Sequence, residues 1–264
     1  MKRILIVAHP DDEILFFSSI LENIEKVIVC FSGSKSKVIT EGREALKSQY
    51  PLSNIEWLNL DESDVFGASD WKKPVLADRG IRVSRDEVSY RETFDNLIEI
   101  FKIKLISYDV VYTHNPWGEY GHEEHVSVFN AVLNSVRGCD KKVFVSCYLS
   151  DRSQKLFLMQ SHLLLGEIQS GIIPKELCAR LKRLYIDCNC WTWDDDYEWP
   201  NWEIFAEIMT DSPTRIDTNH TLTAYPPVML FSRSFRQTLA KKLASKVLSK
   251  SLKNIIKRKL YSRH

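Results

Sequence analysis

The chain has 264 residues and a formal net charge of +1, with 44% hydrophobic and 27% charged residues. These values are ordinary for a globular protein and exclude a chain built from membrane spans, because no stretch approaches the ~20 apolar residues that a spanning helix needs. The six cysteines show no C-x-x-C spacing, and no export signal is recognisable, so we expect reduced thiols in a cytoplasmic protein.

The first predicted element is a buried strand over residues 4–8, a short apolar run rich in β-branched side chains. The sequence HPDDE follows it, so His9, Asp11 and Asp12 stand just beyond the strand's carboxyl end, where open parallel sheets place their ligands. An imidazole with carboxylates is a donor set that zinc and related metals accept. The alternative is that the Asp pair caps a following helix and that His9 is incidental.

Strand and helix patterns then alternate at short spacing. Strands are predicted at residues 26–31, 55–60, 109–113 and 143–148, and helices at residues 42–50 and from residue 84 onward. This alternation indicates βαβ units, so the predicted fold is α/β, with a Rossmann-like, mostly parallel sheet flanked by helices. The polar stretch 61–82 is predicted to be a loop over the strand ends, where binding residues tend to lie.

The second informative stretch is HNPWGEYGHEEH, residues 114–125, directly after the strand at 109–113. His122 and His125 are three residues apart, which would place them on one face of a helix. Surface histidines on an amphipathic helix are the alternative. Because two strand ends of one sheet would bring these groups together, the sequence offers three metal ligands, a carboxylate and an imidazole, which are the parts of a catalytic zinc site.

The HPDDE motif and the later G-x-Y-G-H-x-x-H motif together resemble the PIG-L/LmbE family of zinc-dependent de-N-acetylases. The resemblance covers residues 1–145. It implies one Zn²⁺ per chain, held by His9, Asp12 and His125. It also implies that Asp11 is the general base that activates water, and that His122 stabilises the oxyanion or protonates the leaving amine.

The resemblance assigns four further residues. Tyr120 would lie over the acyl carbonyl, and Trp117 and Arg43 would bind substrate, although a salt-bridged helix arginine is the alternative for Arg43. Many family members have H-P-D-H where this chain has H-E-E-H, so Glu124 would replace the Asp that orients His122 through a hydrogen bond.

We divide the chain into a catalytic α/β domain at 1–150, a helical and Trp-rich extension at 151–232 that completes the same domain, and a basic amphipathic helix at 233–264. The extension is predicted to contain helices at 155–168 and 174–185. Four Trp and a Tyr lie among carboxylates in residues 191–202. They would either stack on sugar rings or pin a loop onto the body.

The C-terminal stretch is strongly basic. Residues 218–264 contain 11 Lys and Arg and no Asp or Glu, which leaves 25 basic against 35 acidic residues in the rest of the chain. A basic amphipathic helix of this kind would either associate peripherally with an anionic membrane, at its inner face, or dock on the acidic body. Nucleic acid is not an expected partner, because the body is negative.

These features together predict a zinc-dependent hydrolase that removes the N-acetyl group from an N-acetylated amino sugar and releases acetate and a free amine. The sugar would be free or linked to a nucleotide, a lipid or a glycan, which suits a role in glycoconjugate biosynthesis. An amidase for a non-sugar or larger acyl amide is one alternative. A catalytically inactive protein that binds glycan or membrane is the other.

Overall fold

The computed structural model describes residues 1–164, 167–210 and 229–230. The largest sheet in this part of the chain has seven strands, in the order β3 (Ile55–Asp61), β2 (Lys26–Gly33), β1 (Arg3–Val7), β6 (Val110–Thr113), β7 (Lys142–Ser146), β10 (Trp202–Ile208) and β9 (Ile168–Ile172). The five strands from β3 to β7 are parallel, and β10 is antiparallel to β7 and to β9. The prediction of a mostly parallel α/β sheet is confirmed.

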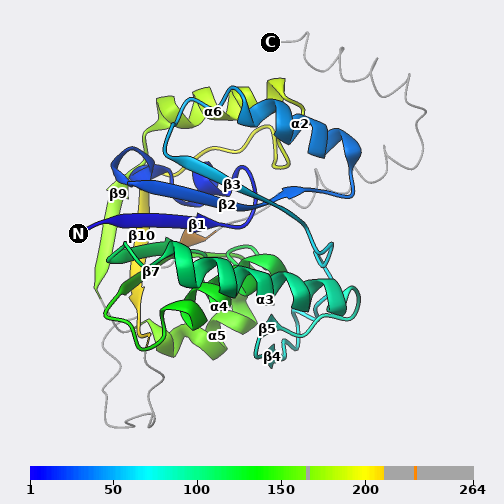
Figure 1. The fold of residues 1–264 in the computed structure, drawn as a ribbon, viewed down its shortest axis with the longest axis vertical. Coiled ribbons are helices and arrows are strands. Elements are labelled where there is room, and N and C mark those ends of the chain that lie inside the picture. The colour runs from blue at the N-terminus through cyan, green and yellow to red at the C-terminus, as the bar shows by residue number, and fades with distance from the viewer. Residues whose placement is uncertain (165–166, 211–228, 231–264) are drawn as a thin grey trace. The chain divides into compact units, whose positions relative to one another are not determined.

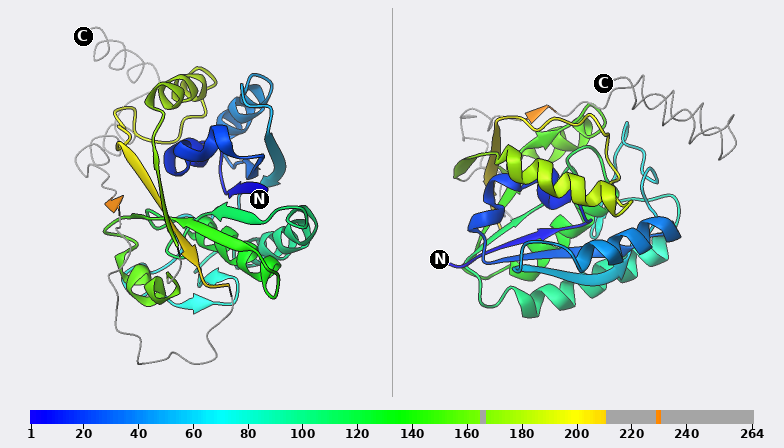
Figure 2. Two further views of the ribbon diagram at one scale, coloured as in Figure 1. Left: turned by 90° about the vertical axis from the view of Figure 1, so that its left-hand side faces the viewer. Right: turned by 90° about the horizontal axis from the view of Figure 1, so that it is seen from above.

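Helices cover both faces of this sheet (Figures 1 and 2). One face carries α2 (Lys37–Lys47) and α6 (Lys175–Asp187), and the other carries α3 (Glu87–Lys104), α4 (Glu123–Val136) and α5 (Gln154–Gln160). Two further sheets in the described residues each consist of two short strands. β4 (Leu76–Ala77) pairs with β5 (Gly80–Ile81), and β8 (Tyr148–Leu149) pairs with β11 (Met229–Leu230).

The apolar run at the start of the chain forms the centre of the core. β1 pairs with β2 on one side and with β6 on the other, and Ile4 to Val7 are fully buried. A parallel strand covered by helices on both faces buries every side chain, which explains why the run is continuous and does not alternate with polar residues. The HPDDE sequence therefore follows a central strand of the sheet.

The helix after β1 is shorter than the sequence indicates. α1 spans only Asp12–Phe16, because Phe17 has φ −140°, and a 3₁₀ helix over Ser18–Asn23 follows. The start of α3 also differs. The helix is predicted from residue 84 onward, but Ser84 donates its hydroxyl to the carbonyl oxygen of Ala68, and the helix begins after Asp86.

The predicted helix at 155–168 is correct only in its first half. α5 ends at Gln160, a 3₁₀ turn covers Ser161–Leu163, and Ile168–Ile172 is the edge strand β9. β10, which lies between β7 and β9, was not predicted either. Residues from the 151–232 stretch thus contribute strands to the same sheet as residues 1–150.

The described residues belong to one compact unit, and the predicted amphipathic helix at 233–264 lies outside them.

All six cysteines are free, and only Cys139 is exposed. Among the helices of the described part, none has a stretch both long and apolar enough to cross a bilayer.

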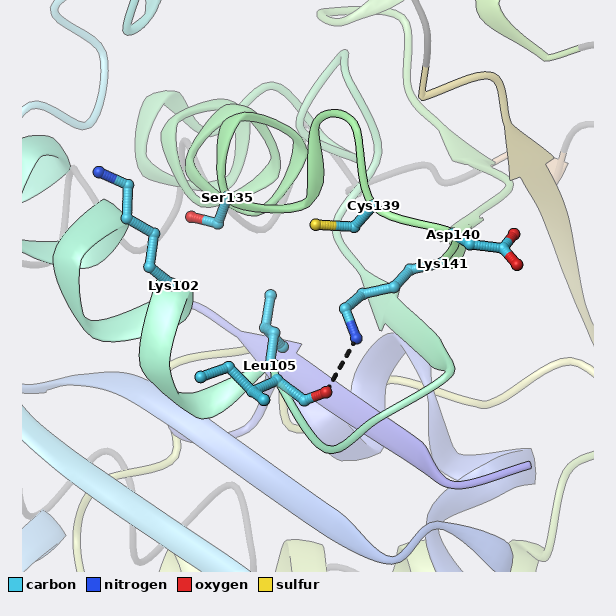
Figure 3. Close-up of a pocket in the computed structure, with 7 residues that line it drawn as sticks. Lys102, Leu105, Ser135, Cys139, Asp140 and Lys141 are labelled. Atoms are coloured by element: carbon cyan, nitrogen blue, oxygen red, sulfur yellow. Dashed lines mark hydrogen bonds between the residues drawn. The ribbon is translucent and has the colours of Figure 1, made fainter.

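A hollow of about 290 Å³ lies at the amino ends of β6 and β7 (Figure 3). Lys141 closes one side of it by donating hydrogen bonds to the carbonyl oxygens of Ile106 and Tyr108, at 3.2 and 2.6 Å. These bonds fasten the segment after α3 to the segment before β7. The hollow is at the edge of the sheet opposite to HPDDE, so it is not part of the site described next.

Candidate active site

The two motifs meet at the carboxyl ends of the neighbouring strands β1 and β6. His9 and Asp12 follow β1, and the loop after β6 leads to His125 in the first turn of α4. These three side chains are buried, with exposed fractions of 6, 2 and 0%. The topology of the sheet therefore brings together residues that are more than a hundred positions apart in the sequence.

Three donor atoms form an equilateral triangle. His9 Nδ1, Asp12 Oδ2 and His125 Nε2 are each 3.3 Å from the other two. In a tetrahedral zinc site, bonds of about 2.0–2.1 Å separate neighbouring ligand atoms by about 3.3–3.4 Å. Two imidazoles and one carboxylate also leave a fourth position open, as in catalytic zinc sites. The spacing and the chemistry of these residues fit a zinc ion.

Each of the two imidazoles also contacts a glutamate carboxylate through the ring nitrogen that lies outside the triangle. Glu119 Oε2 lies 2.8 Å from His125 Nδ1, and Glu124 Oε2 lies 2.9 Å from His9 Nε2. If each carboxylate accepts the ring N–H, the lone pair of the other ring nitrogen points into the triangle. Carboxylates in this position fix the tautomer and orientation of metal-binding histidines.

The electrostatics of the cluster favour positive charge. Burial lowers the pKa of His9, but the hydrogen bonds and charges of Asp12 and Glu124 outweigh burial and raise this pKa to about 10. Burial raises the pKa of Glu119, but the charges and hydrogen bonds of His114 and His125 lower it to about 2. A cluster that retains protons so strongly would also favour a divalent cation in their place.

Two other triads of donors lie close enough to share an ion: His9, His122 and His125, and Asp12, His114 and His125. His114 is already engaged at both ring nitrogens. Its Nε2 is 2.8 Å from the backbone N–H of Ala8, and its Nδ1 is 3.1 Å from Glu119. Because no ring lone pair is left for a metal, these contacts favour a packing role for His114, whose ring stacks on His125 at 3.8 Å.

His122 occupies the N-cap position of α4, and its Nδ1 accepts the backbone N–H of Glu124 at 3.2 Å. In a neutral ring the proton is then on Nε2, which makes His122 a hydrogen-bond donor. Burial and the nearby His9 and His125 hold the pKa of His122 well below its usual value, so the ring is neutral. Its centroid lies 4.6 and 4.7 Å from those of His9 and His125.

The predicted role of Glu124 is wrong in one respect. Its carboxylate contacts His9 and the backbone N–H of Ser63, and it is the backbone of Glu124 that orients His122. The extra methylene of Glu, compared with Asp, carries the carboxylate past His122 toward the end of β1.

Asp11 has an unusual backbone conformation for a residue with a side chain, with φ +96°. Its N–H donates to Glu13 Oε2 and to Tyr185 Oη, at 3.0 and 2.9 Å, and its Oδ2 accepts the hydroxyl of Thr192 at 2.7 Å. Burial and the neighbouring Asp12 raise the pKa of Asp11 to about 8, while the Thr192 hydrogen bond opposes the rise. A buried carboxyl with a pKa near neutrality is suited to general-base chemistry.

The assignment of Trp117 to substrate binding is wrong. Its side chain is fully buried, its Nε1–H donates to the carbonyl oxygen of Tyr148 at 2.6 Å, and its ring packs on Phe157. The loop after β6 turns inward before the positive-φ residue Gly118, so this indole belongs to the core.

Arg43 is 3% exposed and pairs with Glu62 at 2.6 Å, which is the salt-bridged alternative. Its Nε finds no hydrogen-bond acceptor among the described residues. Gly42 allows α2 to approach the backbone of Cys188, because a Cβ there would lie 2.3 Å from that carbonyl oxygen. The positive charge of Arg43 opposes the rise in the pKa of Asp11. A contact between Arg43 and a substrate stays a prediction.

Aromatic side chains surround the triangle. The half-buried ring of Tyr120 lies 5.3 Å from the His125 ring and 4.8 Å from Trp193. Phe66, in the 61–82 loop, is 42% exposed and lies 4.9 Å from His122. The loop is tied to α4, because Glu123 accepts hydrogen bonds from the backbone of Gly67 and Ser69 and from the Trp71 indole.

A cavity of about 760 Å³ lies beside Gly67, and its volume is within the size range of ligand pockets. Arg152 borders it, with its guanidinium 4.7 Å from the Phe66 ring and 5.3 Å from Trp71. The cavity is further lined by Ser69, Asp70, Lys72, Asp151, Gln154 and Lys155. Sequence reasoning pointed to this loop as a binding loop but named none of its residues.

The Trp-rich stretch 191–202 is pinned to the body, which was one of the two alternatives. Trp199 donates its Nε1–H to the carbonyl oxygen of Ile14, and Trp193 is only 7% exposed. The Lys182 ammonium lies 5.3 Å from the Trp191 ring and 5.6 Å from the Trp199 ring.

The fold and the site define an α/β protein with a buried cluster of metal-type ligands at the carboxyl edge of its sheet. A family model described as PIG-L, GlcNAc-PI de-N-acetylase, matches residues 4–136, which is half of the chain. The chain belongs to the PIG-L family.

Two curated relatives match with low identity. Uncharacterized protein L374 of Acanthamoeba polyphaga mimivirus is 24% identical over 140 residues, covering 48% of this chain and 54% of that protein. The 1D-myo-inositol 2-acetamido-2-deoxy-alpha-D-glucopyranoside deacetylase of Corynebacterium diphtheriae is 26% identical over 148 residues, covering 49% of this chain and 50% of that protein. The chain thus matches about half the length of these relatives.

Solved structures of deacetylases are also similar. A deacetylase–teicoplanin complex from teicoplanin biosynthesis is 12% identical, covers 80% of this chain and 100% of its own, and has a TM-score of 0.47. The zinc-inhibited form of teicoplanin deacetylase Orf2 is 11% identical, covers 79% and 98%, and has a TM-score of 0.49.

Proposed function

We propose that this chain is a zinc-dependent hydrolase that removes the acetyl group from an N-acetylated amino sugar. The observation that carries the proposal is the buried triangle of His9, Asp12 and His125, with the outer carboxylates Glu119 and Glu124 behind its two imidazoles. The family description and the name of the Corynebacterium relative support an acetylated amino sugar as the substrate.

In this proposal His9, Asp12 and His125 hold the zinc. Zinc at this position would polarise the amide carbonyl and make water more acidic. Asp11 takes a proton from the water as its oxygen attacks the acetyl carbon. The Nε2–H of His122 donates to the oxyanion that forms on the former carbonyl oxygen.

Asp11 would also act in the second step of the reaction. When the C–N bond breaks, Asp11 returns its proton to the nitrogen, and the products are acetate and the free amine. The hydrogen bond from Glu124 N–H keeps His122 in the tautomer that this role needs.

The test is acetate release from a panel of N-acetylglucosamine conjugates by metal-stripped protein and by protein restored with zinc. We expect release only after zinc is restored. If the protein binds stoichiometric zinc and releases acetate from a non-sugar amide but from no sugar, the substrate is not an amino sugar. Release at full rate by metal-free protein would contradict the metal dependence.

Phe66 is proposed to contact the sugar, because its exposed ring lies beside His122 and beside Arg152, which borders the cavity. We expect Phe66→Ala to raise KM roughly 5- to 10-fold and to leave kcat within about twofold, since a stacking contact binds ground state and transition state alike. Phe66→Tyr keeps the flat ring and is the matched control. A fall in kcat at constant KM would show that Phe66 acts on His122 and does not bind the sugar.

A further inference from the structure

We propose that Thr192 is a positioning residue that holds the side chain of Asp11 ready to accept a proton; this inference rests on the proposed function. The observation is the hydrogen bond of 2.7 Å from the Thr192 hydroxyl to Asp11 Oδ2, with the backbone N–H of Thr192 at 3.4 Å from the same oxygen. Two donors on one carboxylate oxygen restrict the rotation of the side chain.

The backbone of Asp11 is fixed independently. Its left-handed conformation is costly for a residue with a Cβ and persists where the surroundings determine it. Glu13 and Tyr185 both accept the Asp11 N–H, and the Tyr185 hydroxyl donates in turn to Glu13 at 2.6 Å. Tyr50 donates to the same carboxylate. The peptide is therefore held, and the carboxylate is the part whose orientation Thr192 sets.

The oxygen that Thr192 does not bind is the one left for chemistry. Within the described residues, no hydrogen bond reaches Asp11 Oδ1, whereas Oδ2 receives both contacts from Thr192. A carboxylate with one oxygen occupied presents the other in a defined direction. Orientation of this kind matters, because a misplacement of about 1 Å can cost about 100-fold in rate.

The segment that carries Thr192 is itself held in place. Trp199 is bonded to α1 through the carbonyl oxygen of Ile14. Lys182, on α6, donates to the carbonyl oxygens of Asp195 and Tyr197, at 2.6 and 3.3 Å. On the other side of Thr192, the N–H of Cys190 donates to the carbonyl oxygen of Tyr185 at 3.0 Å. Thr192 thus stands between anchored points of the chain, and its hydroxyl is not free to follow Asp11 if that side chain turns.

Thr192 lies outside the region that matches the family model, which ends at residue 136. The base and its proposed positioning residue are 181 positions apart. This contact is therefore a property of the C-terminal part of this chain, added to a site whose proposed metal ligands and base come from the two motifs.

The test compares Thr192→Val with Thr192→Ser in acetate release. We expect Thr192→Val to lower kcat about 10-fold with KM and zinc content unchanged, and Thr192→Ser to stay within about threefold of the unmodified chain. Thr192 is exposed, so either variant should fold normally. Thr40→Val is the matched control, because it removes a hydroxyl on α2 that donates to the carbonyl oxygen of Ser34, and it should leave kcat unchanged.

Three outcomes would overturn the inference. One is an unchanged kcat in Thr192→Val. Another is a Thr192→Ser variant as slow as Thr192→Val, which would assign the effect to the methyl group or to the loop. If the unmodified chain binds zinc but releases acetate from no amide, the proposed function fails and this inference falls with it, whereas the first two outcomes leave the proposed function intact.

Discussion

Replacing Asp11 with Asn is expected to lower kcat for acetate release by about 10²- to 10⁴-fold while zinc content and folding stay normal. The size follows from the usual contribution of a positioned general base. Asn has nearly the same shape and can still accept the Thr192 hydroxyl, so the substitution removes proton acceptance and little else. The measurement is kcat in the acetate assay, with zinc per chain determined in parallel.

The control for this experiment is Asp95→Asn, which changes an exposed carboxylate paired with Arg79 on the surface of α3. Its kcat should match that of the unmodified chain. If Asp11→Asn kept more than a tenth of the activity, another group would have to be the base. Glu13 would then be the first to test, because it is buried beside Asp11 and burial raises its pKa to about 7.

His125→Ala is expected to weaken zinc binding by more than about 100-fold and to abolish acetate release. Residues behind the ligands typically contribute 10- to 100-fold to metal affinity, and removal of a ligand should cost more. His122→Ala should retain zinc and lose activity, because in the proposed site His122 donates to the oxyanion and binds no metal. Zinc affinity, measured by competition with a chelator, separates the two variants.

This pair of variants also decides between the possible donor sets. If His122→Ala lost zinc as readily as His125→Ala, the ion would lie among His9, His122 and His125. The control is His162→Ala, in a 3₁₀ turn after α5, which should change neither zinc affinity nor kcat.

The parts of the fold that the sequence predicted share a strong local signal. β1 and β2 are runs of buried β-branched residues in the middle of the sheet, and such runs are recognisable without a structure. β9 was missed because Ile168–Ile172 alternates exposed and half-buried residues at the edge of the sheet, and its register depends on pairing with β10. Because α5 precedes this strand in the chain, the sequence favoured one long helix at 155–168.

The site residues also divide into those with a local sequence signal and those without one. Residues inside the two motifs, such as His9 and His125, were found by the spacing of residue types and by the family resemblance, and the structure brings them together. Trp117 was misassigned because the sequence around an aromatic residue does not tell whether its ring turns inward. Glu119 could have been noticed as an acid between the histidines. Nothing in the sequence links Thr192 to Asp11, because the two residues are 181 positions apart and meet only in the folded chain.

The insertion of β10 beside β7 has a consequence for how the chain can be divided. β7 is fully buried from Val143 to Ser146, and β10 supplies the hydrogen bonds along its outer side. A fragment that ended near residue 150 would present this apolar strand as an open edge, and open edges of this kind recruit strands from other molecules. The C-terminal strands therefore protect the half of the chain that carries the two motifs from self-association, and the two halves are best regarded as inseparable when the protein is expressed or engineered.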